Sequence, residues 1–267
     1  MRLRAITGFF FVIVMLGSVL LGNVVFTLFY LALSVFCLHE FNGLVKQGTA
    51  DPNLYTGLLN GIFVFLAFAA QSYFPSKFLL FLLPVLLGSI FIQELYKKSE
   101  HPFNNIAYCF LGLLFTITPF TFFHGMAFIS GSFNFHIPLS FLLMLWANDT
   151  GAYVVGSQLG RVKLFPRHSP KKTWEGFIGG ILITAGVAVI LSRYYTEYDW
   201  KQWVSVGILI STFGTMGDLI ESMFKRSINV KDSGGILPGH GGLLDRFDGL
   251  LLAAPIVYAY LYFITNA

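Results

Sequence analysis

Residues 78–92 read FLLFLLPVLLGSIFI, an uncharged run in which polar and apolar residues do not alternate. A membrane-spanning helix needs about 20 mostly apolar residues to cross a bilayer core about 30 Å thick. Dividing the chain at charged, Gly, Pro and Asn positions gives nine comparable runs. They cover 5–21, 24–38, 54–71, 78–93, 106–123, 138–155, 175–192, 203–220 and 249–264. Continuous apolar runs predict an all-α polytopic membrane protein with about nine transmembrane helices, and disfavour a β-barrel.

The composition supports the same class. Charged residues make up 11% of the 267 residues and hydrophobic residues 55%, with a mean hydropathy of +0.71. Soluble domains carry about 25% charged residues, so a soluble globule is excluded. Cys37 and Cys109 both lie in apolar runs, which indicates neither a disulfide framework nor a Cys-based zinc site. No repeat or linker divides the chain, so we expect one membrane domain over 1–267.

The basic residues predict the orientation. We interpret residues 5–38 as two short spans and not as a cleaved signal. Fourteen of the seventeen Lys and Arg residues then fall at the N-terminus or in the alternate loops 39–53, 94–105, 156–174 and 221–248. Among the thirteen acidic residues, only Glu197 and Asp199 lie in the other loops. We therefore expect a cytoplasmic N-terminus and, from the compact length, a bacterial inner membrane. Helices of about 1–137 would form a scaffold, and about 138–267 a catalytic half with cytoplasmic loops 156–174 and 221–248.

Two aspartates lie inside predicted spans. Asp218 is near the end of span 203–220, and Asp149 lies within span 138–155. An ionisable side chain at such a depth costs several kcal/mol unless it is paired, so each is a functional-site candidate. The alternative is a structural pair with a buried Lys or Arg. Asp149 lies about 10 Å below the cytoplasmic end of its span, within reach of a cavity open to the cytosol.

Loop 221–248 combines carboxylates, basic residues and glycines. Asp245 and Asp248 are three residues apart, which places both on one face of a helix, where a divalent cation would stabilise them together. Oxygen ligands favour Mg²⁺ or Mn²⁺ over zinc, and Asp218 could supply a third carboxylate. An isolated Asp-x-x-Asp is more often a solvated helix face. Here basic side chains and five glycines between 234 and 242 offer binding groups for an anion, which together indicate a phosphoryl-transfer site. The basic residues are Lys225, Arg226, Lys231 and Arg246.

Loop 156–174 is the second basic segment. Lys171 and Lys172 come just before span 175–192, where Thr173 can cap the helix N-terminus and the helix dipole favours an anion. The alternative is a plain topology signal, which we favour for Arg161 and Lys163.

The motifs resemble one family closely. The run is Ser222-x-x-Lys225-Arg226-x4-Lys231-Asp232-x3-Ile236-x-Pro238-x-His240-Gly-Gly-x-x-Asp245-Arg246-x-Asp248. With Ser-Pro-Lys-Lys-Thr-Trp-Glu-Gly at 169–176 and Asn-Asp-Thr-x-Ala-Tyr at 148–153, it is similar to the signature of the phosphatidate cytidylyltransferases, or CDP-diacylglycerol synthases. The resemblance is strong over 146–249 and extends to the N-terminal half only as a hydrophobic pattern.

The resemblance implies a reaction and a set of residues. CTP and phosphatidate would give CDP-diacylglycerol and pyrophosphate, a step of phospholipid biosynthesis. The enzyme would be a Mg²⁺-dependent homodimer in membrane lipid, with no nucleic-acid partner. Mn²⁺ in place of Mg²⁺ and an additional monovalent cation stay open. Implied catalytic residues are Asp218, Asp245, Asp248, Lys225 and Arg226, of which the three aspartates would bind the metal. Implied substrate-binding residues are Asn148, Asp149, Ser169, Lys171, Lys172, Lys231, Asp232, His240, Gly241, Gly242 and Arg246.

The chemistry of the reaction suggests a role for His240, and the sequence leaves alternative functions to consider. A phosphatidate oxygen is already anionic at neutral pH, so we expect His240 to donate a hydrogen bond to a phosphate or to fix the loop, and not to act as a general base. A secondary transporter of an anionic solute would also place charges inside spans, but it needs no 28-residue polar loop at one face. A non-catalytic scaffold is a further alternative. The CDP-alcohol phosphotransferases do not fit because no acidic residue follows Asp248, and no Walker loop is present.

Overall fold

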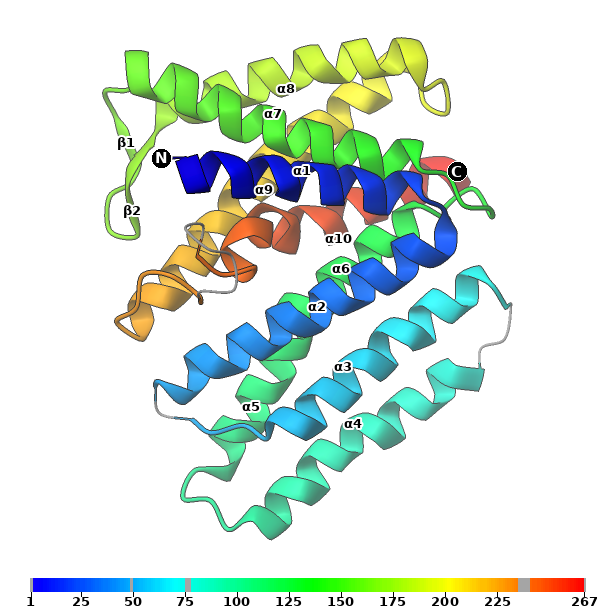
Figure 1. The fold of residues 1–267 in the computed structure, drawn as a ribbon, viewed down its shortest axis with the longest axis vertical. Coiled ribbons are helices and arrows are strands. Elements are labelled where there is room, and N and C mark those ends of the chain that lie inside the picture. Colours follow the sequence, from blue (N-terminus) through cyan, green and yellow to red (C-terminus); the bar gives the residue numbers. More distant parts are fainter. Residues whose placement is uncertain (1, 49, 75–77, 235–240, 267) are drawn as a thin grey trace.

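The computed structural model describes residues 2–48, 50–74, 78–234 and 241–266, with the side chains described from Thr7 onward, and Figure 1 shows that they are almost entirely helical. In chain order the elements are α1 (Arg2–Leu20), α2 (Asn23–Lys46), α3 (Leu54–Ala69), the 3-10 turn η1 (Ala70–Ser72), α4 (Phe78–Lys97), α5 (Pro102–Gly112), the π-turn η2 (Leu113–Ile117), α6 (Thr118–Met126), α7 (His136–Leu159), β1 (Lys163–Phe165), β2 (Ser169–Thr173), α8 (Trp174–Tyr194), α9 (Trp200–Ser227) and α10 (Leu244–Asn266). Strands β1 and β2 pair antiparallel as a small hairpin.

Each of the nine predicted spans falls on helical residues, although span 106–123 includes the π-turn η2. The all-helical expectation needs one correction. Loop 156–174 is not wholly irregular, because α7 runs on to Leu159 and the hairpin fills much of the rest. Among the described residues, seven helices are long and apolar enough to cross a membrane. They are Asn23–Lys46, Leu54–Ser72, Phe78–Lys97, Pro102–Met126, Trp174–Tyr194, Trp200–Ser227 and Leu244–Asn266. α1 has a shorter apolar stretch, Thr7–Leu20, and α7 carries Asn148 and Asp149, so the count of nine stays a prediction.

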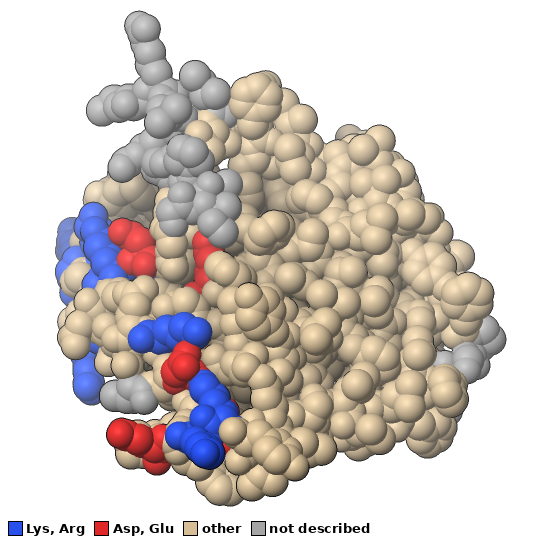
Figure 2. All heavy atoms as spheres, turned by 60° about the horizontal axis from the view of Figure 1, so that its bottom comes forward, with Lys and Arg blue, Asp and Glu red and all other residues tan. Residues whose placement is uncertain are grey.

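The connections between helices lie at two opposite edges. In Figure 1 the hairpin and the connections α2–α3, α4–α5 and α9–α10 lie toward the left and lower left. The turns α1–α2, α3–α4, α6–α7 and α8–α9 lie toward the right. We call the edge that carries the hairpin the charged edge. Figure 2 shows Lys, Arg, Asp and Glu gathered on one side of the displayed face, while the rest of that face is nearly uncharged. The loops predicted to share one side of the membrane therefore do lie together.

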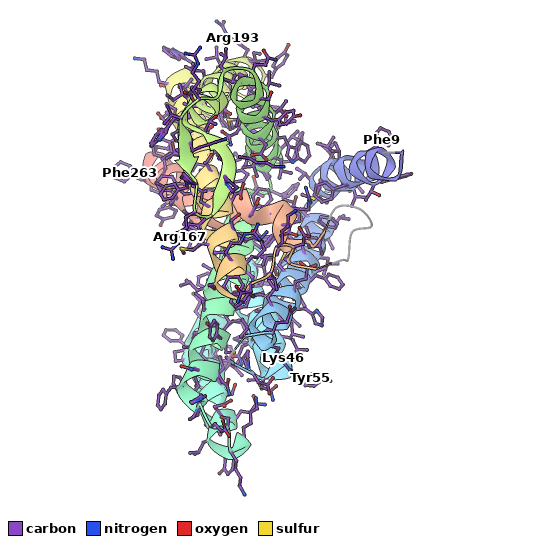
Figure 3. All side chains as sticks on the ribbon, turned by 90° about the vertical axis from the view of Figure 1, so that its left-hand side faces the viewer. Phe9, Lys46, Tyr55, Arg167, Arg193 and Phe263 are labelled. Atoms are coloured by element: carbon purple, nitrogen blue, oxygen red, sulfur yellow. The ribbon has the colours of Figure 1, made fainter. Side chains whose placement is uncertain are left out.

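The helices form two groups. α7, α8, α9 and α10 pack most extensively on one another, while α2 to α6 form a second group that meets them mainly through α6 and α10. α1 stands out from the body, and Phe9 on it points outward in Figure 3. The helices before and after about residue 137 thus pack into different groups, while the division into a scaffold and a catalytic half stays a prediction.

The two groups meet close to the charged edge through α2. This helix continues to Lys46, eight residues beyond the predicted end at 38, because no proline interrupts it before Pro52. The extension brings Glu40 to α10, where its carboxylate accepts hydrogen bonds from the backbone N–H groups of Leu243 and Leu244 at 3.0 and 2.8 Å. The sequence had placed Glu40 in a loop.

A π-turn interrupts the helix that runs from Pro102 to Met126. Residues Leu113–Ile117 form it, and Pro119 follows after Thr118. A proline inside an α-helix lacks an N–H donor, and its ring collides with the carbonyl four residues earlier, here that of Phe115. The wider turn accommodates this conflict. Beyond the turn, Phe120 contacts Phe247 of α10 with ring centroids 5.2 Å apart.

Candidate active site

One face of α9 carries most of the charge in the helix interior. Asp218, Glu221, Ser222 and Lys225 follow at helical spacing, so their side chains share one face. Lys225 Nζ lies 2.6 Å from Glu221 Oε2 and 2.6 Å from Asp245 Oδ1 on α10. Ser222 Oγ donates to Asp218 Oδ1 at 3.3 Å. The ion pairs hold α9 against α10 where the two helices approach the charged edge.

The start of α10 presents the two predicted aspartates. Asp245 lies in its first turn and accepts from Lys225, from Ser233 N–H at 3.0 Å to Oδ2 and from Gly242 N–H at 3.1 Å. Asp248 follows three residues later, is half-buried, and its Oδ1 accepts from Gly249 N–H at 2.7 Å. The carboxyl groups of Asp218, Glu221 and Asp149 lie near enough to Asp248 to interact with it electrostatically. The prediction that Asp245 and Asp248 share one helix face is confirmed.

A cavity of about 440 Å³ opens between α7, the hairpin, α8 and α9. Its charged lining comes from Asp149, Lys171, Lys172 and Asp218. Lys172 Nζ lies 2.5 Å from Asp218 Oδ2, which ties the hairpin to α9. This volume is within the usual range of about 300–1,000 Å³ for ligand pockets.

The hairpin leads directly into α8. Thr173 caps that helix as predicted, because its hydroxyl oxygen accepts from Gly176 N–H at 3.2 Å. The helix N-terminus therefore faces the cavity, where its dipole favours an anion. Figure 3 looks onto the charged edge and shows Arg167, at the tip of the hairpin, pointing away from the body.

Carboxylates outnumber the lysines that they contact. We define the acidic cluster as Asp149, Asp218, Glu221, Asp245 and Asp248. Among the described residues, Lys172 and Lys225 form ion pairs with this cluster, so its five carboxyl groups outnumber these two lysines by three.

This donor set fits a hard divalent cation in chemistry, because such ions bind carboxylate oxygens. In the geometry described, however, no three Asp, Glu, His or Cys side chains between residues 2 and 266 converge closely enough to hold an ion, residues 49, 75–77 and 235–240 aside. Asp245 is the most engaged of the acidic groups, since Lys225 and two backbone N–H groups occupy its oxygens. A three-aspartate metal site stays a prediction.

Other predicted residues lie on the periphery. Arg226 is exposed and donates to Val230 O at 3.3 Å, at the C-terminal end of α9. Lys231, Asp232 and Arg246 are exposed, and Ser169 is half-buried at the start of β2. His240 lies outside the described residues. The structure therefore brings Lys225 into the cluster but not Arg226.

The glycines and Asn148 serve close packing. Gly241 has φ +81°, and a Cβ there would lie 2.8 Å from Asp245 Oδ2. Gly242 already donates its N–H to Asp245. Asn148 is buried against Gly180, where an added Cβ would lie 2.6 Å from Asn148 Oδ1. These contacts shape the site from inside the protein.

Glu221 is a site residue that the motif analysis missed. Its side chain is fully buried, and it lies between Asp218 and Lys225 on the same face of α9. The signal was available: acidic residues at 218 and 221 followed by a lysine at 225 repeat the three- and four-residue spacing of one helix face.

Comparison with known proteins covers the whole chain. The model of the cytidylyltransferase family matches residues 2–264. The phosphatidate cytidylyltransferase of Staphylococcus aureus (strain COL) is 33% identical over 261 residues, which is 96% of this chain and 97% of that protein. The phosphatidate cytidylyltransferase of Bacillus subtilis (strain 168) is 34% identical over 268 residues, 97% of this chain and 96% of its own length. The similarity thus includes the N-terminal half, where motifs alone gave only a hydrophobic pattern. This chain belongs to the cytidylyltransferase family.

Proposed function

We propose that this protein is a phosphatidate cytidylyltransferase, which transfers the cytidylyl group of CTP to phosphatidate and releases pyrophosphate. The cavity at the charged edge carries this proposal, because it joins two lysines and a helix N-terminus to the acidic cluster. The protein is a membrane enzyme with several apolar helices, so a lipid substrate can reach the site without leaving the bilayer. We further propose that the site faces the cytoplasm across a bacterial inner membrane.

The residues of the cavity suggest how the triphosphate binds. Lys171 and Lys172 line it beside the start of α8, so their charges and the helix dipole would offset the phosphates of CTP. Lys172 also touches Asp218, which sets its ammonium group at the boundary between the cavity and the acidic cluster. We therefore assign triphosphate binding to Lys171 and Lys172.

The reaction needs alignment more than proton removal. A phosphate oxygen of phosphatidate attacks the α-phosphorus of CTP in line with the departing pyrophosphate; a new P–O bond forms as the bond to the β-phosphate breaks. The attacking oxygen is already anionic, so the protein has to overcome repulsion between two phosphate groups. Lysines in fixed positions reduce this repulsion, and an in-line geometry aligns the attacking oxygen with the α-phosphorus.

Mg²⁺ is the proposed cofactor, with Mn²⁺ as a substitute and a monovalent cation as a possible companion. Asp218 and Asp248 would hold the ion, and it would neutralise charge on the transferred phosphoryl group. Asp245, also predicted as a ligand, has its oxygens engaged by Lys225 and two N–H groups, so we assign it first to holding Lys225. Lys225 in turn compensates Glu221.

The direct test is pyrophosphate release by detergent-purified protein given CTP and phosphatidate, with and without Mg²⁺. We expect release that requires both substrates and the metal ion. Asp218→Asn should lower turnover by about 100-fold or more, as loss of a key electrostatic group does. Asp51→Asn is the matched control, because Asp51 is an exposed aspartate in a loop at the same charged edge. Absence of release, with uptake of an anionic solute in proteoliposomes, would instead establish a transporter.

The membrane orientation is tested by cysteine labelling. Cys37 and Cys109 are free and buried and can be replaced, after which His168→Cys places a thiol at the hairpin and Ser130→Cys one at the opposite edge. In sealed right-side-out vesicles we expect a membrane-impermeant reagent to label position 130 only. Labelling of position 168 would reverse the proposed orientation. The proposed homodimer is checked on the same preparations by the mass of the protein in detergent.

A further inference from the structure

We propose that Glu40, on α2 in the N-terminal half, is a positioning residue of the active site. It holds the first turn of α10, and so fixes where Asp245 and Asp248 lie. The inference rests on the proposed function for its kinetic consequences, but its structural content can be tested without it.

The contacts of Glu40 are all directed at the start of α10 and the segment that precedes it. Its side chain is buried, with 6% of its surface exposed. Oε1 accepts from Leu243 N–H at 3.0 Å, and Oε2 accepts from Leu244 N–H at 2.8 Å. Oε2 also accepts from Ser233 Oγ at 3.2 Å. Both carboxylate oxygens are therefore committed to this one segment.

The two backbone donors need a partner from elsewhere. Leu244 is the first residue of α10, and the first N–H groups of a helix have no acceptor within it. A negative charge at that end also interacts favourably with the helix dipole. Most helices obtain this cap from a residue next to the first turn; here it comes from a residue 203 and 204 positions earlier in the chain. Glu40 thus links the placement of α10 to the scaffold half.

Ser233 connects this cap to the acidic cluster. Its hydroxyl donates to Glu40, while its backbone N–H donates to Asp245 at 3.0 Å. Asp245 then contacts Lys225 at 2.6 Å. A displacement of Glu40 is therefore passed to Asp245 and Lys225 through contacts no longer than 3.2 Å.

The glycines of the motif make room for this carboxylate. A Cβ at Gly234 would lie 2.8 Å from Glu40 Oε1, and one at Gly242 would lie 2.6 Å from Glu40 Oε2. The sequence pattern suggested that bare backbone in this region gathers around a phosphate. In the structure, the N–H groups of Leu243 and Leu244 turn instead to Glu40, and those of Ser233 and Gly242 turn to Asp245. At least these two glycines serve an internal anion.

Glu40 does not line the substrate cavity, so we assign it no contact with the reacting atoms. Its role is to keep two aspartates at a fixed place relative to α9. A positioning role predicts that a defect appears in turnover and in local backbone protection, and not in the affinity for CTP.

The test compares Glu40→Gln with Glu94→Gln. Glutamine keeps the size of Glu40 but replaces one acceptor by an N–H₂ group that faces donors, so the cap is lost in part. We expect kcat to fall about tenfold or more, because losing a buried helix cap costs enough free energy to displace the first turn of α10. KM for CTP should change less than about twofold. Glu40→Asp, which keeps the charge, should recover part of the turnover.

Glu94 is the matched control. It is equally buried, at 5% exposure, and accepts from Asn105 Nδ2 at 2.6 Å and from Ser99. It belongs to α4, in the N-terminal half, and its partners are residues of the α4–α5 connection and of α5. Glu94→Gln should leave kcat per folded molecule within about twofold of the wild type, since its contacts end within the scaffold.

Hydrogen exchange gives a readout independent of activity. The amides of residues 243–248 should exchange about tenfold faster in Glu40→Gln than in wild type or Glu94→Gln. Gly234→Ala adds a methyl group against Glu40 Oε1 and should produce the same faster exchange. It replaces Glu40→Gln in the test if that variant does not fold. Unchanged exchange at 243–248 in both variants, or equal loss of turnover in Glu94→Gln, would overturn the inference. If wild-type protein released no pyrophosphate, the proposed function would fail while the exchange comparison still decided the role of Glu40.

Discussion

The two halves of the molecule bury polar groups in different ways. In the N-terminal half most buried polar side chains belong to Ser, Thr, Asn and His: Asn60 Nδ2 donates to Thr56 O at 3.0 Å, and His124 Nε2 lies 2.9 Å from Thr27 Oγ1. The C-terminal half instead concentrates five carboxylates around two lysines. Hydrogen bonds of this kind stabilise helix packing without a bound ion. A cluster with more carboxyl groups than paired cations is suited to bind a charged ligand, which supports the proposal that the chemistry takes place in the second half.

The halves also differ in how closely their helices approach. Aromatic rings fill the N-terminal half, as where Phe26 and Tyr30 meet Phe123. Glycines in the C-terminal half lie against backbone: a Cβ at Gly176 would lie 2.8 Å from Ala152 O, and one at Gly217 would lie 2.4 Å from Asp248 O. Side chains can shift to absorb a substitution, whereas backbone in direct contact cannot. The second half should therefore be the less tolerant one.

The largest difference should appear between Lys225→Met and Lys46→Met. Lys225 is buried and serves Glu221 and Asp245, so its loss leaves two carboxylates without a cation and should cost about 3–5 kcal/mol of stability. Turnover should become undetectable. Lys46 pairs with exposed Asp51, and its loss should cost at most about 1 kcal/mol.

Thermal unfolding and pyrophosphate release on both purified variants measure these effects. Equal unfolding temperatures for Lys225→Met and Lys46→Met would mean that the C-terminal cluster is no more sensitive to charge than the loops of the scaffold.

A smaller difference should separate Gly217→Ala from Gly88→Ala. The added methyl group at 217 would press on a backbone carbonyl of α10, and such overpacking costs about 1–3 kcal/mol. At Gly88, on α4, no atom lies within 4 Å of the added Cβ among the described residues, so alanine should stabilise the helix by up to about 1 kcal/mol. Opposite shifts in apparent Tm would verify the contrast in packing. Shifts of the same sign at both positions would refute it.

The smallest effect concerns Asp51, in the loop between α2 and α3. Hydrogen bonds from Lys97 and then Lys46 hold the pKa of Asp51 below its ordinary value of 3.8. A carboxyl whose pKa is lowered on folding contributes stability above its unfolded pKa and loses it as pH falls through the folded value. Asp51→Asn should thus lower the apparent Tm slightly at pH 7 and by less near pH 3. A difference that grew on acidification would show that the pairs do not stabilise the fold.

Local pattern predicted much of this molecule. The shared helix face of Asp245 and Asp248 and the cap at Thr173 are both confirmed. Each depends on residues within one or two helical turns of one another, where periodicity and capping chemistry are decisive.

Contacts between distant segments could not be predicted in this way. Glu40 meets α10 only because α2 runs on to Lys46, and Lys172 meets Asp218 only because a hairpin folds the chain back toward α9. A linear pattern carries no information on which helices become neighbours. The same limit applies to the glycine-rich segment, which the sequence related to a bound anion: the N–H group of Gly242 binds Asp245, a carboxylate of the protein itself.

The π-turn at Leu113–Ile117 holds one residue more than a regular helical turn, so the helix on either side keeps its phase despite the extra residue. Each α-helical residue turns the chain by about 100°, so deleting one residue from the regular turns of α5 would rotate the nine residues Thr118–Met126 by that angle. Phe120 would leave Phe247, its neighbour between Arg246 and Asp248 on α10. Insertions and deletions in descendants of this sequence should therefore accumulate in the turns at the two edges and spare this segment, although it carries no catalytic group.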